Sequence, residues 1–278
     1  MLAVLCFCSG LAVLAGKWVP GEIAKIVYGL VVTAFFLALT LLARKRASLR
    51  SFWELPFAFF VLAVVQLLNN SIPHYVGVYL HDPPTTHNPL ASTVHGSVII
   101  QLLDTAIAIV PIVAFTKLAG MDLGSIYLRR GRFGARFIIA IVGLVLFYGL
   151  SARGSHRMIP TNGTVTPERF LAWTPALLVL VISNGFQEEV LFRGLFLRKF
   201  NNFFGIHVSN VLQAAVFAVA HIGVTYTPSD LLFIVLFVFP LGLFTGYLMR
   251  TTDSVIAPAI FHAGADLPIY LAFLSYVA

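Results

Sequence analysis

Six ionisable residues in the last third of the chain have types and spacings that could support acid–base chemistry. They are Glu188, Glu189, Arg193, His221, His262 and Asp266. Residues four apart share a helix face, so Glu189 can pair with Arg193, and Asp266 can lie beside His262. Glu188 faces about 100° away from Glu189 and has no such partner in the sequence.

These side chains include the groups that peptide hydrolysis requires. A carboxylate in a poorly solvated site can take a proton from water. Histidines can orient that water, or they can bind a metal ion that activates it. Further donors must stabilise the oxyanion that forms on the scissile carbonyl. Phe217 and His221 also share a helix face, so we expect an aromatic ring beside this imidazole.

Three motifs carry a resemblance to a known family. They are Glu188-Glu189-x-x-x-Arg193, Phe217-x-x-x-His221 and His262-x-x-x-Asp266. In this order and on separate apolar segments, they resemble the CAAX prenyl protease and bacteriocin-processing family of intramembrane proteases, also described as type II CAAX endopeptidase-like. The resemblance covers about residues 175–270 and includes Phe192-Arg193-Gly194 and Gly242-x-x-x-Gly246-Tyr247. It implies an intramembrane endopeptidase that acts on a membrane-associated protein or peptide.

The resemblance implies a role for each residue at the reacting centre. Glu188 would activate water, and His221 would hold the same water or a metal ion. His262 would join them and, with Asp266, would contribute to the oxyanion site. The substrate would be a protein or peptide, with or without a lipid chain, because nothing in the sequence indicates a prenyl group.

Other charged residues would act outside the reaction itself. The resemblance implies that Glu189 and Arg193 fix the helix, and that Arg193 could also anchor a substrate carboxylate. Asp104 stands in the fourth apolar segment, outside the matched motifs. Asp104 could either pack between helices or line the cavity.

Position 266 bears on whether a metal takes part. The family often has Asn there, whereas this chain has Asp266. An ionised Asp cannot donate a hydrogen bond, but it can bind a metal directly or orient His262. The substitution favours a metal-assisted site, with Zn as the metal and Glu188, His221, His262 and Asp266 as its ligands. Because the family has been described both with and without a metal, a site with no cofactor stays open.

The elements that must position these residues are membrane helices. Of 278 residues, 59% are hydrophobic and 10% are charged, and the mean hydropathy is +0.92. A soluble domain has about 25% charged residues, and a spanning helix needs about 20 mostly apolar residues. Suitable segments lie near 1–16, 21–43, 52–69, 95–117, 136–152, 170–197, 207–222, 229–249 and 254–275. We therefore predict an all-α, polytopic bundle of eight or nine transmembrane helices around an intramembrane catalytic cavity.

The bundle is expected to be continuous, with N-terminal helices and loops in 1–165 and the catalytic core in 166–278. The segment 70–94 is rich in Pro, Asn and Thr, which argues against a continuous helix there. The first segment, 1–16, has the length of a signal peptide but no preceding Lys or Arg, so we interpret it as a short membrane helix.

The formal charge of +7 is interpreted as a signature of membrane topology and not of nucleic-acid binding. Basic residues concentrate in a few joints, and placing these in the cytoplasm gives a cytoplasmic N-terminus and an external C-terminus. The chain is thus expected to be a multi-pass integral membrane protein, in the plasma membrane if its source is prokaryotic.

One geometric difficulty follows from the helix lengths. Counted from residue 207, His221 would lie ~21 Å deep, whereas His262 would lie only ~12 Å deep when counted from Ser254. The two imidazoles can meet only if helices are tilted, or if the helix that ends at His221 begins inside the membrane.

Competing functions would use the same ionisable cluster. A non-catalytic transporter or scaffold could place carboxylates and histidines on a proton or cation pathway. Many transporter folds show duplicated halves, and no internal repeat is visible here. A membrane protein that confers immunity to a peptide toxin would use the same fold, so only its substrates would distinguish it.

Overall fold

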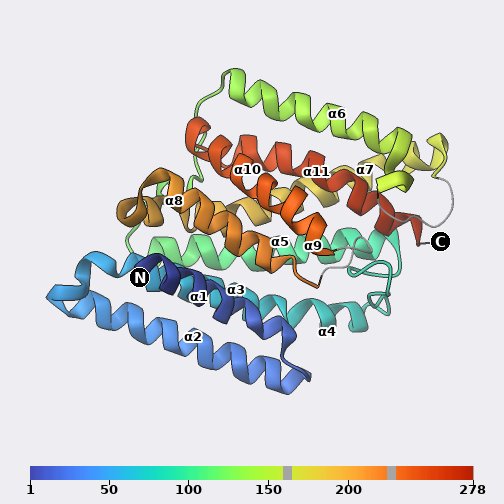
Figure 1. Cartoon of the computed structure of the whole chain (residues 1–278). Coiled ribbons are helices and arrows are strands. Elements are labelled where there is room, and N and C mark those ends of the chain that lie inside the picture. The colour runs from blue at the N-terminus through green and yellow to red at the C-terminus, as the bar shows by residue number, and fades with distance from the viewer. Residues whose placement is uncertain (159–164, 224–229, 278) are drawn as a thin grey trace.

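Helices make up all the regular secondary structure of the part of the chain that is described. The computed structural model describes residues 1–158, 165–223 and 230–277, and no strand occurs among them. Eight of the helices are long and apolar enough to cross a membrane. The predicted all-α polytopic bundle is therefore confirmed, and its helices lie side by side along a common direction (Figure 1).

The N-terminal half consists of five α-helices and three short 3₁₀ segments. They are α1 (Leu2–Leu14), η1 (Ala15–Trp18), α2 (Glu22–Lys45), η2 (Ala47–Phe52), α3 (Glu54–Asn69), α4 (Ile72–Tyr79), α5 (Val94–Leu118) and η3 (Leu123–Ile126). Helix α3 contacts α1, α2 and α5, so it is the central helix of this half. The apolar outer face of α2 stays exposed, with Ile23 81% accessible, as expected for a helix that faces lipid.

Helix α4 lies inside the segment where we predicted no continuous helix. Pro73 stands at its first positions, where a missing N–H costs no intrahelical hydrogen bond. The helix ends at Tyr79, and residues 80–93 contain no further helix. The chain there is held by Asp82, whose carboxylate accepts hydrogen bonds from the backbone and side chains of Ser92 and Thr93.

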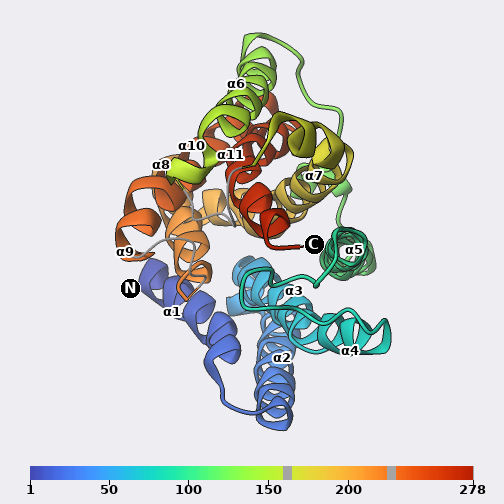
Figure 2. The same cartoon turned by 90° about the vertical axis from the view of Figure 1, so that its right-hand side faces the viewer.

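The C-terminal half holds six α-helices and two π-helical segments. They are α6 (Ala135–Met158), α7 (Pro167–Glu188), η4 (Glu189–Gly194), α8 (Leu197–Ala220), α9 (Asp230–Phe233), η5 (Ile234–Val238), α10 (Phe239–Thr252) and α11 (Ile256–Ser275). Helix α11 packs between α6 and α7, as seen along the bundle in Figure 2. It is the most buried of the spanning helices, with 67% of its apolar window inside the protein.

Small residues allow α11 to approach both neighbours closely. A Cβ atom on Gly185 of α7 would lie 2.7 Å from the Ala259 carbonyl oxygen of α11. On the other side of α11, a Cβ atom on Gly264 would lie 2.9 Å from the Leu144 Cα of α6. Association of membrane helices depends on such close backbone packing, because lipid provides little hydrophobic driving force between helices.

Helix α8 contains the one non-helical residue within its bounds. Gly205 has φ 70° and ψ 172°, so the backbone breaks there. This conformation is open to glycine because it lacks a Cβ atom. The helix that ends at His221 therefore begins only after Gly205.

Several basic joints lie at one end of the bundle. The α2–α3, α5–α6 and α10–α11 connections all lie at the left of Figure 1. There Asp253, in the α10–α11 turn, pairs with both Arg129 and Arg198. This grouping agrees with a common side for the basic joints, while the assignment of that side to the cytoplasm stays a prediction.

Candidate active site

Glu188 is the last residue of α7 and is followed directly by the π-helical segment η4. Within this segment the Leu195 N–H donates to the Val190 carbonyl at 2.9 Å, five residues back. The wider turn is an uncommon backbone form that occurs frequently at functional sites. A second π-helical segment, η5, lies beside the same site.

Glu189 and Arg193 form a fully buried pair behind the site. The Glu189 Oε1 lies 3.2 Å from Arg193 Nη1, and both side chains are 0% exposed. The guanidinium also stands over the Phe217 ring, 3.8 Å from its centroid. Because Phe217 covers Arg193, a substrate carboxylate could contact the guanidinium only if this ring moved.

His221 follows the last turn of α8 and is oriented by its own helix. Its Nδ1 lies 2.9 Å from the Phe217 carbonyl oxygen. A carbonyl can only accept, so Nδ1 carries the proton and Nε2 is left with a lone pair when the ring is neutral. That Nε2 lies 3.9 Å from Glu188 Oε2.

His262, in the second turn of α11, is oriented by the buried pair. Its Nδ1 lies 2.8 Å from Glu189 Oε1, and the imidazole is nearly inaccessible. Its Nε2 faces the other way, 3.5 Å from Glu188 Oε2 and 3.6 Å from Asp266 Oδ1. Glu189 thus holds Arg193 on one side and His262 on the other.

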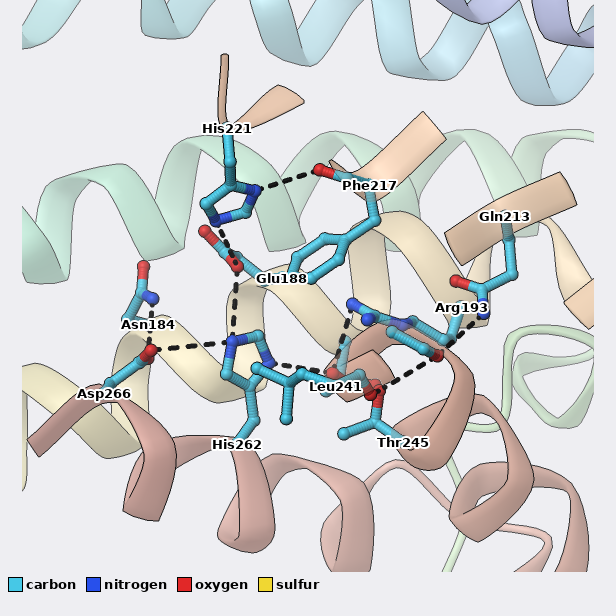
Figure 3. Close-up of polar contacts among 12 residues, drawn as sticks. Asn184, Glu188, Arg193, Gln213, Phe217, His221, Leu241, Thr245, His262 and Asp266 are labelled. Atoms are coloured by element: carbon cyan, nitrogen blue, oxygen red, sulfur yellow. Dashed lines mark hydrogen bonds and ion pairs between the residues drawn. The ribbon is translucent and has the colours of Figure 1, made fainter. Parts of the chain in front are cut away.

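The three side chains that were predicted to share one water lie together (Figure 3). The Nε2 atoms of His221 and His262 both face Glu188 Oε2, at separations longer than a hydrogen bond. Glu188 Oε2 is buried and has no hydrogen-bond partner in the described part of the chain. The two imidazoles therefore meet in this fold, despite the unequal depths expected from the helix lengths.

Asn184 is a site residue that the sequence analysis did not identify. Its Nδ2 donates to Asp266 Oδ2 at 2.9 Å. Asn184 precedes Glu188 by one helical turn, so the four-residue spacing used for the other pairs also applies to it. An amide nitrogen has two N–H groups, and Asp266 occupies one of them.

A second polar group that the sequence did not reveal supports α7 from behind. Gln101 of α5 donates to Gln187 at 3.2 Å and accepts from the Tyr270 hydroxyl at 2.7 Å. These bonds join α5, α7 and α11 next to Glu188. Asp104 lies one turn further along α5, and in the described residues its Oδ1 has no hydrogen-bond partner.

Glu188, His221, His262 and Asp266 are the side chains at the site that could bind a metal ion. Among the described residues, no group of three or more His, Cys, Asp or Glu side chains is arranged to hold one. The hydrogen bonds to Glu189 and Asn184 occupy His262 Nδ1 and Asp266 Oδ2, and they leave His262 Nε2 and Asp266 Oδ1 available. Zn at this site stays a prediction, and no chemical step is derived through a metal.

An apolar cavity of about 670 Å³ opens beside these groups. His221, His262 and Asp266 line one part of it, and the rest is almost entirely aliphatic and aromatic. Much of the apolar wall comes from η5, α10 and α11. The polar groups thus stand at the edge of a space suited to an apolar chain.

The fold and site define a polytopic α-helical membrane protein with a carboxylate–histidine centre among its helices. The family model described as type II CAAX prenyl endopeptidase Rce1-like matches residues 170–268. This region contains all six ionisable residues of the three motifs, so the inferred resemblance is confirmed, and it supports a CAAX-type intramembrane protease. Neither the curated proteins nor the solved structures contain a significant match to the chain.

Proposed function

We propose that the chain is an intramembrane endopeptidase that hydrolyses a peptide bond of a membrane-associated protein or peptide. The observation that carries this proposal is the approach of two imidazole Nε2 atoms to one carboxylate oxygen. His262 and His221 lie 3.5 and 3.9 Å from Glu188 Oε2, and the three residues come from three separate elements. A single water between them could contact all three groups.

In the proposed reaction, Glu188 takes a proton from this water while the water oxygen attacks the scissile carbonyl carbon. His221 Nε2 accepts a hydrogen bond from the other O–H of the water and thereby orients the attack. The resulting tetrahedral intermediate collapses with breakage of its C–N bond. Glu188 gives its proton to the leaving amine, so the carboxylate is regenerated and no proton is gained or lost overall.

The negative charge on the tetrahedral intermediate needs donors nearby. Asn184, whose amide contacts both Asp266 and Glu188, can supply an N–H, and a protonated His262 can supply its Nε2–H. In this proposal Asp266 orients Asn184 and His262 and does not itself donate. Glu189 and Arg193 are positioning residues, because Glu189 fixes the His262 ring and Arg193 balances its charge.

The cavity indicates the kind of substrate that the site accepts. Its walls are apolar except where the two histidines and Asp266 emerge. A substrate would therefore place an apolar segment or a lipid chain in the cavity, with its scissile bond at the polar edge. We propose a membrane-embedded peptide, with or without a lipid chain, as the substrate.

The proposal is tested with the purified full-length protein in lipid vesicles. Farnesylated and unmodified peptides of one sequence, together with apolar peptides, are incubated with the vesicles, and products are identified by mass spectrometry. Glu188→Gln should lower kcat by about 10²- to 10⁴-fold without a change in the melting temperature, because a general base is lost. Equal cleavage by wild type and Glu188→Gln would contradict the proposal.

The same assay tests the metal question. In the metal-free reaction proposed here, prolonged incubation with EDTA or 1,10-phenanthroline should leave kcat within about twofold of the untreated value. Metal analysis of the purified protein should find far less than one equivalent of zinc. Loss of activity with the chelator, restored by added Zn²⁺, would replace the metal-free reaction with a metal-assisted one.

A further inference from the structure

The end of α8 is where the protein must hold His221 in place. The last carbonyl groups of an α-helix have no partner inside the helix and carry partial negative charge. His221 is the capping residue of α8, so its backbone belongs to this exposed turn. Within its own helix, the ring is held by the hydrogen bond to the Phe217 carbonyl and by contact with the Phe217 ring.

A lysine from the opposite end of the sequence caps this turn. The Lys17 Nζ donates to the Ala220 carbonyl at 2.6 Å and to the Ile222 carbonyl at 2.7 Å. These two carbonyls belong to the residues on either side of His221. An ammonium group at a helix C-terminus is favoured by the helix dipole and satisfies carbonyls that would otherwise face the bilayer or water.

Lys17 is held there by the packing of its own segment. Helix α1 lies along α8 in both views of the fold (Figures 1 and 2). A Cβ atom on Gly10 would lie 2.9 Å from Val216 Cγ2, so the two helices are in close contact. Cys6, Val13 and Leu14 are buried in the core that α8 also joins. The ammonium also stands over the Trp18 ring, 4.7 Å from its centroid.

We propose that Lys17 is a positioning residue for His221, and that the segment Leu2–Trp18, which holds Lys17, supports the active site. This inference rests on the proposed function, because it assigns Lys17 a role through a histidine that acts in the reaction. It also extends the functional unit to a segment far outside residues 170–268, where the family model matches. Lys17 acts by fixing the backbone on both sides of His221.

The physical reason is the sensitivity of catalysis to geometry. A displacement of about 1 Å in a reacting group can cost about 100-fold in rate. Without Lys17, two carbonyls at the end of α8 would lose their partner, and the turn that carries His221 would fray. Substrate contacts in the cavity would persist, so the loss should fall on kcat and leave KM nearly unchanged.

The test compares three variants of the full-length protein in lipid vesicles. Lys17→Met keeps the apolar stem and removes the donors, whereas Lys17→Arg keeps a cation with several donors. Lys25→Met is the matched control, because among the described residues Lys25 pairs only with Glu22, on the surface of α2. We expect Lys17→Met to lower kcat about 10- to 100-fold, Lys17→Arg to recover most of it, and Lys25→Met to match wild type.

Two outcomes would overturn the inference. One is a kcat for Lys17→Met equal to that of the Lys25→Met control. The other is an equal loss for Met and Arg that follows a drop in melting temperature, which would indicate a structural role only. If Glu188→Gln retains full activity, the proposed function fails independently of Lys17.

Amide hydrogen exchange separates the two proposals in that case, because it requires no activity. Residues 218–223 should exchange faster in Lys17→Met than in wild type, with Lys17→Arg close to wild type. Unchanged exchange in Lys17→Met would show that Lys17 does not order this turn, and the inference would be lost whatever the enzyme cleaves.

Discussion

Glu188 and Glu189 are adjacent in the sequence but occupy different environments. The Glu189 carboxylate is fully buried and contacts both Arg193 and His262. The Glu188 side chain keeps 19% of its surface accessible and faces the two imidazole Nε2 atoms. One glutamate is therefore placed to act on water and the other to hold its neighbours.

This division predicts different effects on stability for the two isosteric Glu→Gln substitutions. Glu189→Gln would leave Arg193 buried without a counter-charge, and breaking a buried pair in this way costs about 3–5 kcal/mol. We expect a large loss of stability in Glu189→Gln, measured by denaturant or thermal unfolding in detergent. Glu188→Gln should unfold like wild type.

A suitable control for this comparison is Glu22→Gln, which breaks the accessible pair with Lys25 on α2. Exposed pairs contribute little to stability, so this variant should be indistinguishable from wild type. The assignment of Glu189 to positioning would be wrong if Glu189→Gln were as stable as Glu22→Gln.

At the residue scale, most of the proposed site could be predicted from spacing. The four-residue intervals in the three motifs predicted the Glu189–Arg193 pair, the Phe217–His221 contact and the approach of Asp266 to His262, and each pair is in contact. Asn184 was missed although it has the same spacing from Glu188. Burying a neutral amide in an apolar helix costs less than burying a charge, so an amide is a weaker indication of a functional site. Lys17 could not be found this way, since 203 residues separate it from Ala220.

At the scale of elements, the approach of α7 to α11 sets the distance between Glu188 and His262. Gly185 stands one turn before Glu189, and a Cβ atom there would lie 2.7 Å from the Ala259 carbonyl and 3.0 Å from the Ala263 nitrogen. Both contacts are to backbone, which cannot move aside as a side chain can. The two helices would have to separate.

Gly185→Ala should therefore reduce both stability and kcat. Overpacking of a close contact costs about 1–3 kcal/mol, and a shift of about 1 Å between Glu188 and His262 would lower kcat about 100-fold. Gly149→Ala is the matched control, because a Cβ atom at Gly149 of α6 would have no described atom within 4 Å. Wild-type kcat in Gly185→Ala would show that this contact does not set the site.

The sequence predicted the transmembrane helices but not every feature of their backbone. Apolar segments of spanning length identified the transmembrane helices, because the bilayer requires long runs without charge. The two π-helical segments and the helical turns from Leu197 to Gly205 were not predicted, whereas the expected start near residue 207 agrees with the break at Gly205. Hydrophobic patterns report which segments are buried, but they carry no signal for a local change in backbone hydrogen bonding.

At the scale of the whole molecule, the site is built by long-range contacts between the two halves of the chain. Helix α5 supports α7 through Gln101 and Gln187, and the N-terminal segment caps α8 through Lys17. Both contacts start outside residues 170–268, the region that the family model matches. The division into an N-terminal part and a catalytic core therefore describes the order of the sequence. It does not separate the surroundings of the proposed active site, because groups from both parts lie around it.

The account depends on Glu188 and the two histidines acting on the same water. A double-mutant cycle tests this dependence more directly than any single variant, because groups that act as a unit give non-additive losses. Cleavage rates are measured for Glu188→Gln, His221→Ala and the combined variant in the same vesicles. We expect the combined variant to be no slower than the slower single variant. Losses that multiply in the combined variant would show that Glu188 and His221 act independently, and would contradict the account.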